Sequence, residues 1–469
     1  MGKEFKNVGE TEMKVGKKRI ELSTTQIVAL SFLLAIIVGT VLLKLPISSK
    51  SGEWTSTLDA LFMATTSVCV TGLVTRTTAE YWSTFGQVVI LLLIQMGGLG
   101  IISFTTSFIL MLGKRVSLKD RLLLEDAFNL NTLSGLVKFL KWIFRGTFFV
   151  EGLGALGYMI RFIPQYGPKG IWYSVFTAIS AFCNAGIDIL GSDSLAQYAK
   201  DPWVNFVTMT MIILGGLGFI VWQDCLGMVK QICTKEVHPR YWFRKLKLHT
   251  KIVLVLTISL ILLGTAGVFS LEYNNMDTIG SFTLGEKLLA SLFQSVTTRT
   301  AGFLTVSQAG LKDSTAWLCL IFMYIGGSPV GTAGGIKTVT IAILFLAALS
   351  IIKGNENVTV FGRRIPQLVV RKSIAVVGVS VLVLFLATLL MTIAMPDTSL
   401  IDILFETTSA IATVGLSRDL TGQLNIPGQL IIITLMYLGR IGPISMAIAI
   451  NMKKKKSQII LPKEDVTVG

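Results

Sequence analysis

The sequence is poor in the residues that most metal and catalytic sites need. Among 469 residues there are two histidines and five cysteines, with no CxxC pair. This excludes the usual zinc and haem ligand patterns. The cysteines, which we interpret as structural thiols, are Cys69, Cys183, Cys225, Cys233 and Cys319. No catalytic dyad emerges either, so an enzyme is the class that the sequence supports least, and no bound cofactor is expected.

Charged residues are also scarce. They make up 15% of the chain, against roughly 25% of an average soluble domain, while 52% of the residues are hydrophobic. Eight apolar stretches are long enough to cross roughly 30 Å of hydrocarbon, which predicts an all-α integral membrane protein with eight transmembrane helices. The expected spans are 26–46, 83–112, 141–163, 203–228, 251–272, 315–352, 370–395 and 428–452.

Acidic residues are fewer than basic ones, 27 against 42. Most lysines and arginines flank span ends on one side, so the positive-inside rule predicts a multi-pass plasma-membrane protein with both termini in the cytoplasm. Because these residues form no single patch, nucleic-acid binding is disfavoured. The first twenty residues are too polar for a signal peptide, and the first span is therefore expected to be retained.

Four of the outward-facing segments repeat one pattern. Each holds a semi-apolar stretch too short to span a bilayer, ends in a motif with glycine, and precedes a second glycine run by 24 to 29 residues. The short stretches are 59–73, 173–187, 289–303 and 402–416, and the later runs are QMGGLG, ILGGLG, YIGGSPVG and YLGRIGP. The repetition predicts four units of span, re-entrant pore helix, extended segment and span around a pseudo-fourfold pore.

The repeats give a predicted division of the chain. Flanking segments are expected to be cytoplasmic, and residues 326–338 are expected to form an intramembrane gating loop within the third repeat. The boundaries are 1–25 for the N-terminal segment, 26–112 for repeat 1, 113–228 for repeat 2 with its preceding cytoplasmic loop, 229–352 for repeat 3, 353–452 for repeat 4 and 453–469 for the C-terminal tail.

The glycine-ended motifs suit a selectivity filter. A dehydrated cation needs a cage of oxygens, which backbone carbonyls from four segments around one axis supply, and glycine reaches the backbone conformations that this requires. Thr413-Val414-Gly415 matches the TVG of potassium-channel filters, and the other motifs are looser versions. The predicted filter residues are Val70, Thr71, Gly72, Asn184, Ala185, Gly186, Thr300, Ala301, Gly302, Thr413, Val414 and Gly415. Six residues before the glycine, three copies have a residue with a hydroxyl group. The third copy has Val296 at this position instead.

Charges near these motifs point to a cation. Each pore helix would aim its carboxyl end, with its partial negative charge, at the axis. About half of the carboxylates lie on outward segments, although an ordinary solvated surface explains any one of them. Arg299 beside the third motif does not fit a cation funnel, and we expect it to turn away from the axis and pair with a carboxylate.

The glycine runs would lie below the filter. In the first two copies they either face a water-filled vestibule or let helices pack closely. Arg440, within the fourth span, is a functional candidate that would set an electrostatic barrier or pair off-axis with a carboxylate. In the third copy GTAGGIKT is similar to a phosphate-binding loop, but Ile336 separates Gly335 from Lys337 and the run follows no strand.

Taken together, the four filter motifs, GGSPVGTAGGIKT and GRIGP make the chain resemble the Trk/Ktr/HKT superfamily of potassium-uptake proteins. The similarity is greatest to the bacterial Ktr branch with its KtrB and KtrD subunits, and it runs from about residue 22 to the end. It implies a gate beneath the filter formed by the intramembrane loop and completed by an arginine. The implied gate residues are Gly326, Gly327, Ser328, Pro329, Gly331, Thr332, Gly334, Gly335, Lys337 and Arg440.

The resemblance also implies partners that the residues alone do not show. Pore subunits of the family pair as homodimers on a cytosolic ring of nucleotide-binding (RCK-type) regulatory subunits, and 461–469 would contribute to the dimer contact. Uptake in the Ktr branch is typically stimulated by sodium. No GxGxxG follows a strand in this chain, so nucleotide control would come from another polypeptide.

Three functions stay open at this point. The first is potassium uptake through the filter. The second is a poorly selective monovalent cation channel of the same architecture, which the missing second glycine of TVGYG favours. The third, a symporter for an organic solute, predicts a midplane pocket with side-chain ligands instead of four carbonyl-lined segments.

Overall fold

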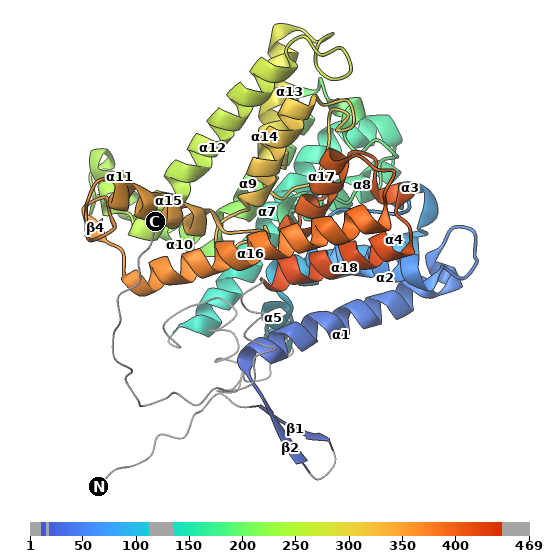
Figure 1. The fold of residues 1–469 in the computed structure, drawn as a ribbon, viewed down its shortest axis with the longest axis horizontal. Coiled ribbons are helices and arrows are strands. Elements are labelled where there is room, and N and C mark those ends of the chain that lie inside the picture. Colours follow the sequence, from blue (N-terminus) through green and yellow to red (C-terminus); the bar gives the residue numbers. More distant parts are fainter. Residues whose placement is uncertain (1–10, 16–17, 112–134, 443–469) are drawn as a thin grey trace.

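The computed structural model describes residues 11–15, 18–111 and 135–442, most of them in helices (Figure 1). Within these residues the strands form two short antiparallel hairpins: β1 (Thr11–Val15) with β2 (Lys18–Leu22), and β3 (Thr359–Val360) with β4 (Arg363–Arg364). The predicted all-α class is confirmed. The predicted tail, 453–469, and its proposed dimer contact lie outside the described residues.

The same helix order occurs four times along the chain. A long helix is followed by two shorter ones, the first of which is the short buried helix. The four triplets are α1 (Thr24–Lys44), α2 (Thr57–Cys69) and α4 (Thr84–Leu99); α7 (Leu136–Tyr166), α8 (Lys169–Cys183) and α9 (Pro202–Leu217); α12 (Leu248–Glu272), α13 (Leu284–Thr297) and α14 (Asp313–Tyr324); α16 (Gln367–Ala394), α17 (Leu400–Ala412) and α18 (Ile426–Ile441). The exact residues at which one repeat passes to the next stay a prediction.

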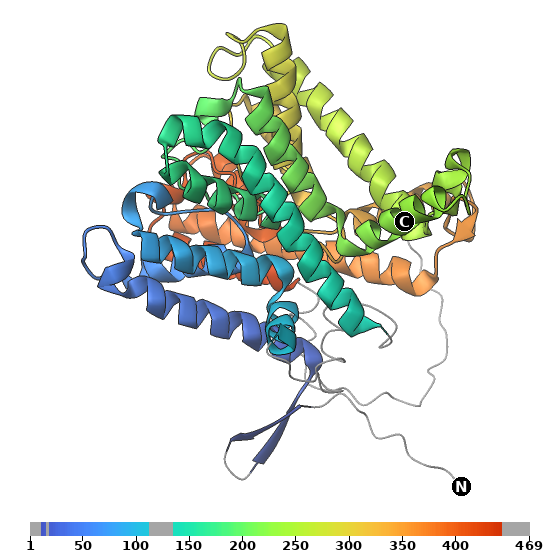
Figure 2. The ribbon, with the colours of Figure 1, turned by 180° about the vertical axis from the view of Figure 1, so that it is seen from behind.

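Further helical elements lie within the triplets and between them. They are η1 (Pro46–Ser48), α3 (Thr78–Tyr81), α5 (Ile101–Met111), η2 (Ala196–Tyr198), α10 (Phe219–Cys233), η3 (Pro239–Tyr241), α11 (Trp242–Lys245), α15 (Thr338–Ile352) and η4 (Thr421–Gln423). Seen from behind, α7 (teal) crosses the molecule beside α9 (Figure 2).

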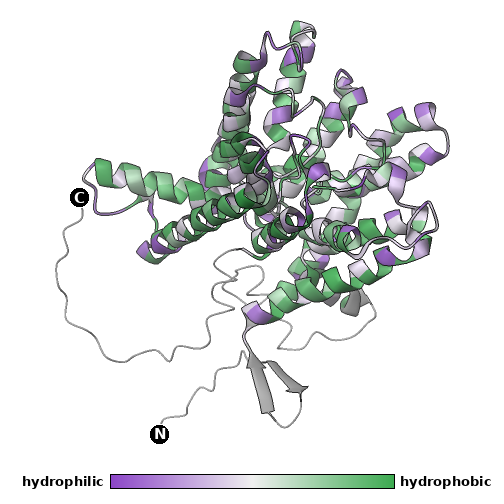
Figure 3. Cartoon of the chain, turned by 45° about the vertical axis from the view of Figure 1, so that its right-hand side comes forward, coloured by the Kyte–Doolittle hydropathy of each residue, from purple (hydrophilic) through white to green (hydrophobic). Residues whose placement is uncertain are grey.

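The short helices form the centre of the molecule. From residue 59 to its end α2 is buried at all but one position, with polar side chains such as Thr65 and Ser67 included. Hydroxyl side chains fix where these helices begin, since Ser56 and Ser399 each accept a hydrogen bond from the N–H three residues on. The long helices around them expose apolar side chains such as Leu34 and Leu263, and most of the residues along these helices are hydrophobic (Figure 3).

Glycines break the helices that follow the short ones. The range predicted as one span over 203–228 is a bent pair, with α9 and α10 meeting at 100°. Gly218 at this bend has φ 88°, and Gly100 between α4 and α5 has φ 83°, a region that favours glycine. By length and composition three described helices, α1, α12 and α16, are able to cross a membrane, or four if the bent pair counts as one. The count of eight spans stays a prediction.

Candidate ion pathway

Each short helix leads into one of the four predicted filter motifs, which we call the glycine segments (70–72, 184–186, 300–302 and 413–415). In every segment the first residue and the glycine have positive φ, and the residue between them does not. This places the β-branched residues Val70, Thr300 and Thr413 in the left-handed region at φ 54°, 65° and 51°, which costs about 1–3 kcal/mol per residue. Such strain persists only where the surroundings enforce it.

Each segment's glycine faces the backbone carbonyl oxygen of the middle residue in the next segment. In three of the four pairs a Cβ built on the glycine would lie 2.6 to 2.7 Å from that oxygen, and in the fourth it would lie closer. The pairs are Gly72 with Ala185, Gly186 with Ala301, Gly302 with Val414 and Gly415 with Thr71. Because the last pair returns to the first repeat, the four segments close into a ring in which only glycine fits.

Hydroxyl groups from the short helices hold the ring in place. Thr66 Oγ1 accepts a hydrogen bond from the Gly72 N–H at 2.9 Å, and Ser409 Oγ accepts one from the Gly415 N–H at 3.1 Å. Ser180 Oγ instead donates to the carbonyl of Ile187 at 2.5 Å. These bonds fix the glycine backbone, so its carbonyls are positioned before any ion arrives.

The third repeat makes the equivalent bond with a different residue. Helix α13 ends at Thr297, five residues before its glycine, whereas the other short helices end three residues before theirs. Thr297 Oγ1 donates to the carbonyl of Phe303 at 2.5 Å, so the hydroxyl that Val296 appeared to remove is supplied by its neighbour. A search that allowed a shift of one position would have found it.

A cavity lies against one end of the ring. Its volume is about 310 Å³, and all four segment glycines line it together with Asp188 and Asp419. Asp188 is half-buried and accepts a hydrogen bond from the Leu190 N–H at 3.1 Å. Burial raises the pKa of the Asp188 carboxyl to about 6. An ionised carboxylate at this mouth would attract cations.

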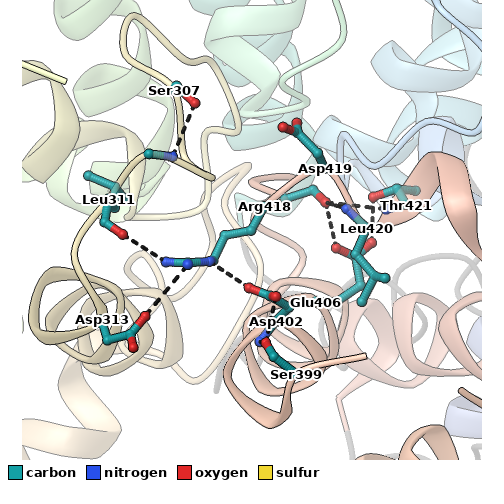
Figure 4. Close-up of polar contacts among 12 residues, drawn as sticks. Ser307, Leu311, Asp313, Ser399, Asp402, Glu406, Arg418, Asp419, Leu420 and Thr421 are labelled. Carbon is teal, nitrogen blue, oxygen red and sulfur yellow. Dashed lines mark hydrogen bonds and ion pairs between the residues drawn. The ribbon is translucent and has the colours of Figure 1, made fainter. Parts of the chain in front are cut away.

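Other predicted outward carboxylates have structural partners. Arg418 is clamped between Asp402 at 2.6 Å and Asp313 at 3.6 Å, and it also donates to the Leu311 carbonyl at 3.1 Å (Figure 4). Buried Glu406 accepts from the hydroxyls of Ser417 and Thr421. These contacts join the outer loops of repeats three and four. The carboxylates that line the cavity are Asp188 and Asp419.

The same ion pair recurs in the first repeat. Asp59 accepts from Arg76 Nε at 3.3 Å and from Thr75 Oγ1 at 3.0 Å. Like Asp402, it lies in the first turn of its short helix, and its basic partner follows the segment glycine. Asp59 is therefore a buried carboxylate with structural partners, and not the ordinary solvated surface residue considered from the sequence.

The glycine-rich loop (326–338) lies at the other end of the ring. Its neck is closed by hydrogen bonds from the Gly326 N–H to the Ile336 carbonyl at 2.9 Å and from the Thr338 N–H to the Gly327 carbonyl at 3.0 Å. Lys337 Nζ donates to the Ala333 carbonyl at 2.7 Å, inside the loop. The loop therefore leaves the helical path and returns to it at a closed neck, and the Lys337 ammonium is hydrogen-bonded inside the loop.

The tip of this loop contacts the glycine segments from below. A Cβ on Gly334 would overlap Thr413 Oγ1, and one on Gly335 would lie 3.1 Å from the Ala412 carbonyl. Thr332 Oγ1 donates to the carbonyl of Phe182 at 2.9 Å, at the end of α8. The loop therefore lies beneath repeats two and four at the end of the ring opposite the cavity.

The second repeat holds the loop through its own glycine run. The N–H groups of Ser328 and Thr332 donate to the carbonyls of Gly216 and Gly215 at 2.9 and 3.1 Å. The close approach is possible because Gly331 and Gly218 lack side chains, with a Cβ on Gly331 lying 3.1 Å from the Gly218 Cα. The loop therefore packs against the bend between α9 and α10 and is hydrogen-bonded to the end of α9.

The remaining glycine runs let helices pack closely. A Cβ on Gly97 would overlap the carbonyl of Val68, and one on Gly439 would overlap that of Ile411. These carbonyls end the short helices α2 and α17. Of the two interpretations of the runs, close packing is the one that the described contacts support.

Arg440 links the loop to the first repeat. It donates to the Thr332 carbonyl at 2.7 Å, to the Gly98 carbonyl at 3.2 Å and to the Gly97 carbonyl. No described carboxylate pairs with it, so the off-axis ion pair considered from the sequence is not formed. Arg440 therefore bonds the loop through a backbone oxygen, in addition to the hydrogen bonds that hold the loop to Gly215, Gly216 and Phe182 of the second repeat.

The expected carboxylate partner of Arg299 is absent from the described residues. This arginine is 7% exposed, its nearest polar contact is Thr257 Oγ1 at 3.4 Å, and its Nε has no partner. It lies at the end of α13, where the helix dipole is negative and favours a cation. That prediction was wrong for the part of the chain that the structure describes, because the guanidinium reaches the Thr257 hydroxyl of α12 and no described carboxylate.

One buried carboxyl escaped the sequence interpretation. Glu151 in α7 is 4% exposed and accepts from Gln95 Nε2 in α4 at 3.0 and 3.2 Å. Cys183, which precedes the second glycine segment, lies 3.6 Å from Gln95 Oε1. The hydrogen bonds between Gln95 and Glu151 join the first repeat to the second. An acidic residue inside a predicted span is the signal that would have singled it out.

Four glycine segments in a closed ring, each led by a short buried helix and surrounded by apolar helices, define a membrane transport protein of the pore-loop class. The family model described as "TrkH: Cation transport protein" matches residues 6–459. The chain belongs to this family. It is a multi-pass membrane protein of a cation-transport family and not an enzyme.

Relatives similar over nearly their whole length carry potassium in their names. The potassium/sodium uptake protein NtpJ of Enterococcus hirae is 38% identical, with 97% of this chain and 100% of that protein covered. The Ktr system potassium uptake protein B of Bacillus subtilis is 37% identical, covering 96% and 98%. The protein of the same name from Vibrio alginolyticus is 36% identical, covering 95% and 94%.

A solved structure shares the fold. The potassium transporter TrkH from Vibrio parahaemolyticus superposes with a TM-score of 0.72 over 91% of this chain and 84% of that chain, at 16% sequence identity. The helical architecture is therefore that of a known transporter fold.

Proposed function

We propose that this protein takes up potassium across the plasma membrane through the ring of glycine segments, whose backbone carbonyls replace the water around the ion. The observation that carries the proposal is the closed cycle of four glycines, each against a carbonyl oxygen of the next segment. Such a cycle supplies many equivalent oxygens at fixed spacing, which is what a dehydrated monovalent cation requires. The segments would form the selectivity filter, with potassium bound there as cargo.

The glycine-rich loop and Arg440 would form the gate. The loop lies under the ring and contacts Thr413 and Ala412, where an ion leaving the filter would pass. Arg440 holds it through the Thr332 carbonyl. Breaking this bond would uncouple the loop from the first repeat while its neck stayed closed. Opening the path would also require the loop to leave Gly215, Gly216 and Phe182 of the second repeat.

Regulation would come from outside the chain. Relatives named for a Ktr system imply further components, and we propose a homodimer of this chain on a cytosolic ring of nucleotide-binding subunits, with cytoplasmic termini. Sodium stimulation is proposed on the same basis, supported by the name of the potassium/sodium uptake relative. None of these features requires a covalent cofactor.

The alternative is a poorly selective monovalent cation channel. It is favoured by the single glycine in each segment, because fewer fixed carbonyl layers discriminate less sharply between potassium and sodium. Flux of potassium and of sodium into liposomes that contain the purified protein separates the two. We expect potassium influx to exceed sodium influx at equal gradients, and equal rates would favour the alternative.

A further inference from the structure

A second cavity lies far from the ring, between α5 and α7. Its volume is about 330 Å³, and it is lined by Ser107 and Leu110 of α5 and by Lys141, Phe144, Arg145 and Phe148 of α7. Two of these residues are cationic, three are apolar and one carries a hydroxyl. A cavity lined by both cationic and apolar side chains suits an amphipathic molecule.

Among the described residues the polar side chains of this cavity form no ion pair and no side-chain hydrogen bond. Within the described part of the chain neither Lys141 nor Arg145 forms an ion pair, although both are exposed. Ser107 is 5% exposed, and its hydroxyl makes no hydrogen bond. A buried hydroxyl without a partner is unfavourable, so a ligand that accepts a hydrogen bond from it would be stabilised.

The surface of α7 continues the pattern beyond the cavity. Lys141, Arg145 and Phe148 follow one another at intervals of four and three residues and therefore share a face. Further along, Phe149, Leu153 and other apolar side chains are 50% or more exposed: Phe149 66%, Leu153 53%, Leu156 60% and Ile160 58%. The exposed surface thus passes from basic to aromatic to aliphatic along the helix.

We propose that the cavity between α5 and α7 binds an anionic phospholipid, with its phosphate between Lys141, Arg145 and the Ser107 hydroxyl and its acyl chains along α7. Basic pockets between membrane helices on the cytoplasmic side bind anionic headgroups, and the positive-inside rule would place this end of α7 there. The aromatic and aliphatic continuation favours a lipid over free phosphate, because a phosphate ion would leave it uncovered.

Lipid retention on the intact protein tests the proposal directly. Native mass spectrometry of the purified protein titrated with phosphatidylglycerol or phosphatidylcholine should show one preferred phosphatidylglycerol site. The double variant Lys141→Gln with Arg145→Gln should bind it about tenfold more weakly. Equal retention by wild type and double variant would overturn the proposal, as would displacement of the lipid by millimolar inorganic phosphate.

A matched control separates this site from general charge attraction. Lys230→Gln with Arg240→Gln removes two exposed basic residues that line no part of the cavity and should leave retention unchanged. Ser107→Ala keeps both charges and should weaken binding less than the double variant. Gel filtration and thermal unfolding establish that each variant is folded, and a loss of retention in the control equal to that in the double variant would contradict the assignment.

Covalent capture identifies what fills the cavity. Phosphatidylglycerol with a photoreactive diazirine in its acyl chain, reconstituted with the protein and irradiated, should label peptides that contain Phe148 and Leu153. Labelling confined to other helices would contradict the proposal, because it would mean that protein segments fill the space instead.

Discussion

The carbonyl oxygen of Thr71 occupies the space into which a side chain on Gly415 would extend. The two residues come from opposite ends of the chain, and their contact joins the fourth repeat to the first. Without it the four glycine segments would form an open row, and an ion between them would meet oxygens on three sides only. The ring is therefore a property of the whole chain and of no single motif.

Replacing Gly415 should damage selectivity first. Gly415→Ser adds a side chain at φ 92°, where a Cβ would overlap the Thr71 carbonyl, so the fourth segment must move away from the axis. Liposome flux should show a lower ratio of potassium to sodium influx, by about tenfold or more if even one carbonyl contact is lost. Gly422→Ala, which lines the same cavity but has no atoms near its Cβ position, should keep the wild-type ratio. An unchanged ratio in Gly415→Ser would count against the filter.

Shortening the glycine-rich loop should raise flux. Deleting residues 328–334 joins Gly327 to Gly335, whose neighbours already touch, since a Cβ on Gly326 would lie 3.0 Å from the Gly335 Cα. The deletion removes the contact with Thr413 and the acceptor of Arg440 but keeps the bond from Gly326 to Ile336. We expect faster rubidium influx into liposomes than in the wild type. Wild-type flux in a deletion variant that elutes as a folded protein would show that the loop is only a helix break.

Breaking the Arg418 cluster should cost stability. Its side chain is 10% exposed and bonds Asp402, Asp313 and the Leu311 carbonyl, so Arg418→Gln leaves a buried acceptor and two carboxylates without their partner. The free energy of unfolding in detergent should fall by about 1–3 kcal/mol. Arg161→Gln removes an exposed partner of Asp201 and should cost less than about 1 kcal/mol. Equal losses in both variants would mean that the cluster has no special role.

External acid should slow uptake through Asp188. Burial raises the pKa of this carboxyl to about 6, so lowering the external pH from 7.5 to 5 protonates it and removes negative charge beside Asp419 in the cavity. Potassium influx should fall over this range, while Asp188→Asn should be slower at pH 7.5 and lose most of the pH dependence.

The same shift fixes the expected stability of that variant. A carboxyl whose folded pKa lies above its ordinary value destabilises the fold when ionised, a penalty that is present at neutral pH and disappears as the pH falls through 6. At pH 7.5 the unfolding temperature of Asp188→Asn should therefore equal or exceed that of the wild type. A full wild-type pH profile in the variant would assign the titration to another group.

The position of the glycine segments could be predicted because it depends on local sequence. A residue at φ 92° such as Gly415 is nearly always glycine, and the four copies repeat at similar spacing. The loop was equally visible, since helix breakers interrupt an apolar run at Gly326 and Pro329. Features that depend on local backbone conformation can be recognised in the sequence without knowledge of the tertiary contacts.

Features that depend on contacts between repeats could not be predicted. The 100° bend at Gly218 lies within a continuous apolar run, and only the N–H groups of the glycine-rich loop, which bond Gly216, reveal why the helix ends there. Contacts between helices of one repeat are equally hidden, since Arg299 reaches the Thr257 hydroxyl of α12 where the sequence indicated a carboxylate.

Anomalous scattering from rubidium is the most direct test of the central claim, because rubidium replaces potassium and marks its positions. Crystals of the protein grown or soaked in rubidium chloride should show anomalous difference peaks on the axis enclosed by Gly72, Gly186, Gly302 and Gly415, above the glycine-rich loop. Peaks found only elsewhere, with none on that axis, would contradict the assignment of the glycine segments as the filter.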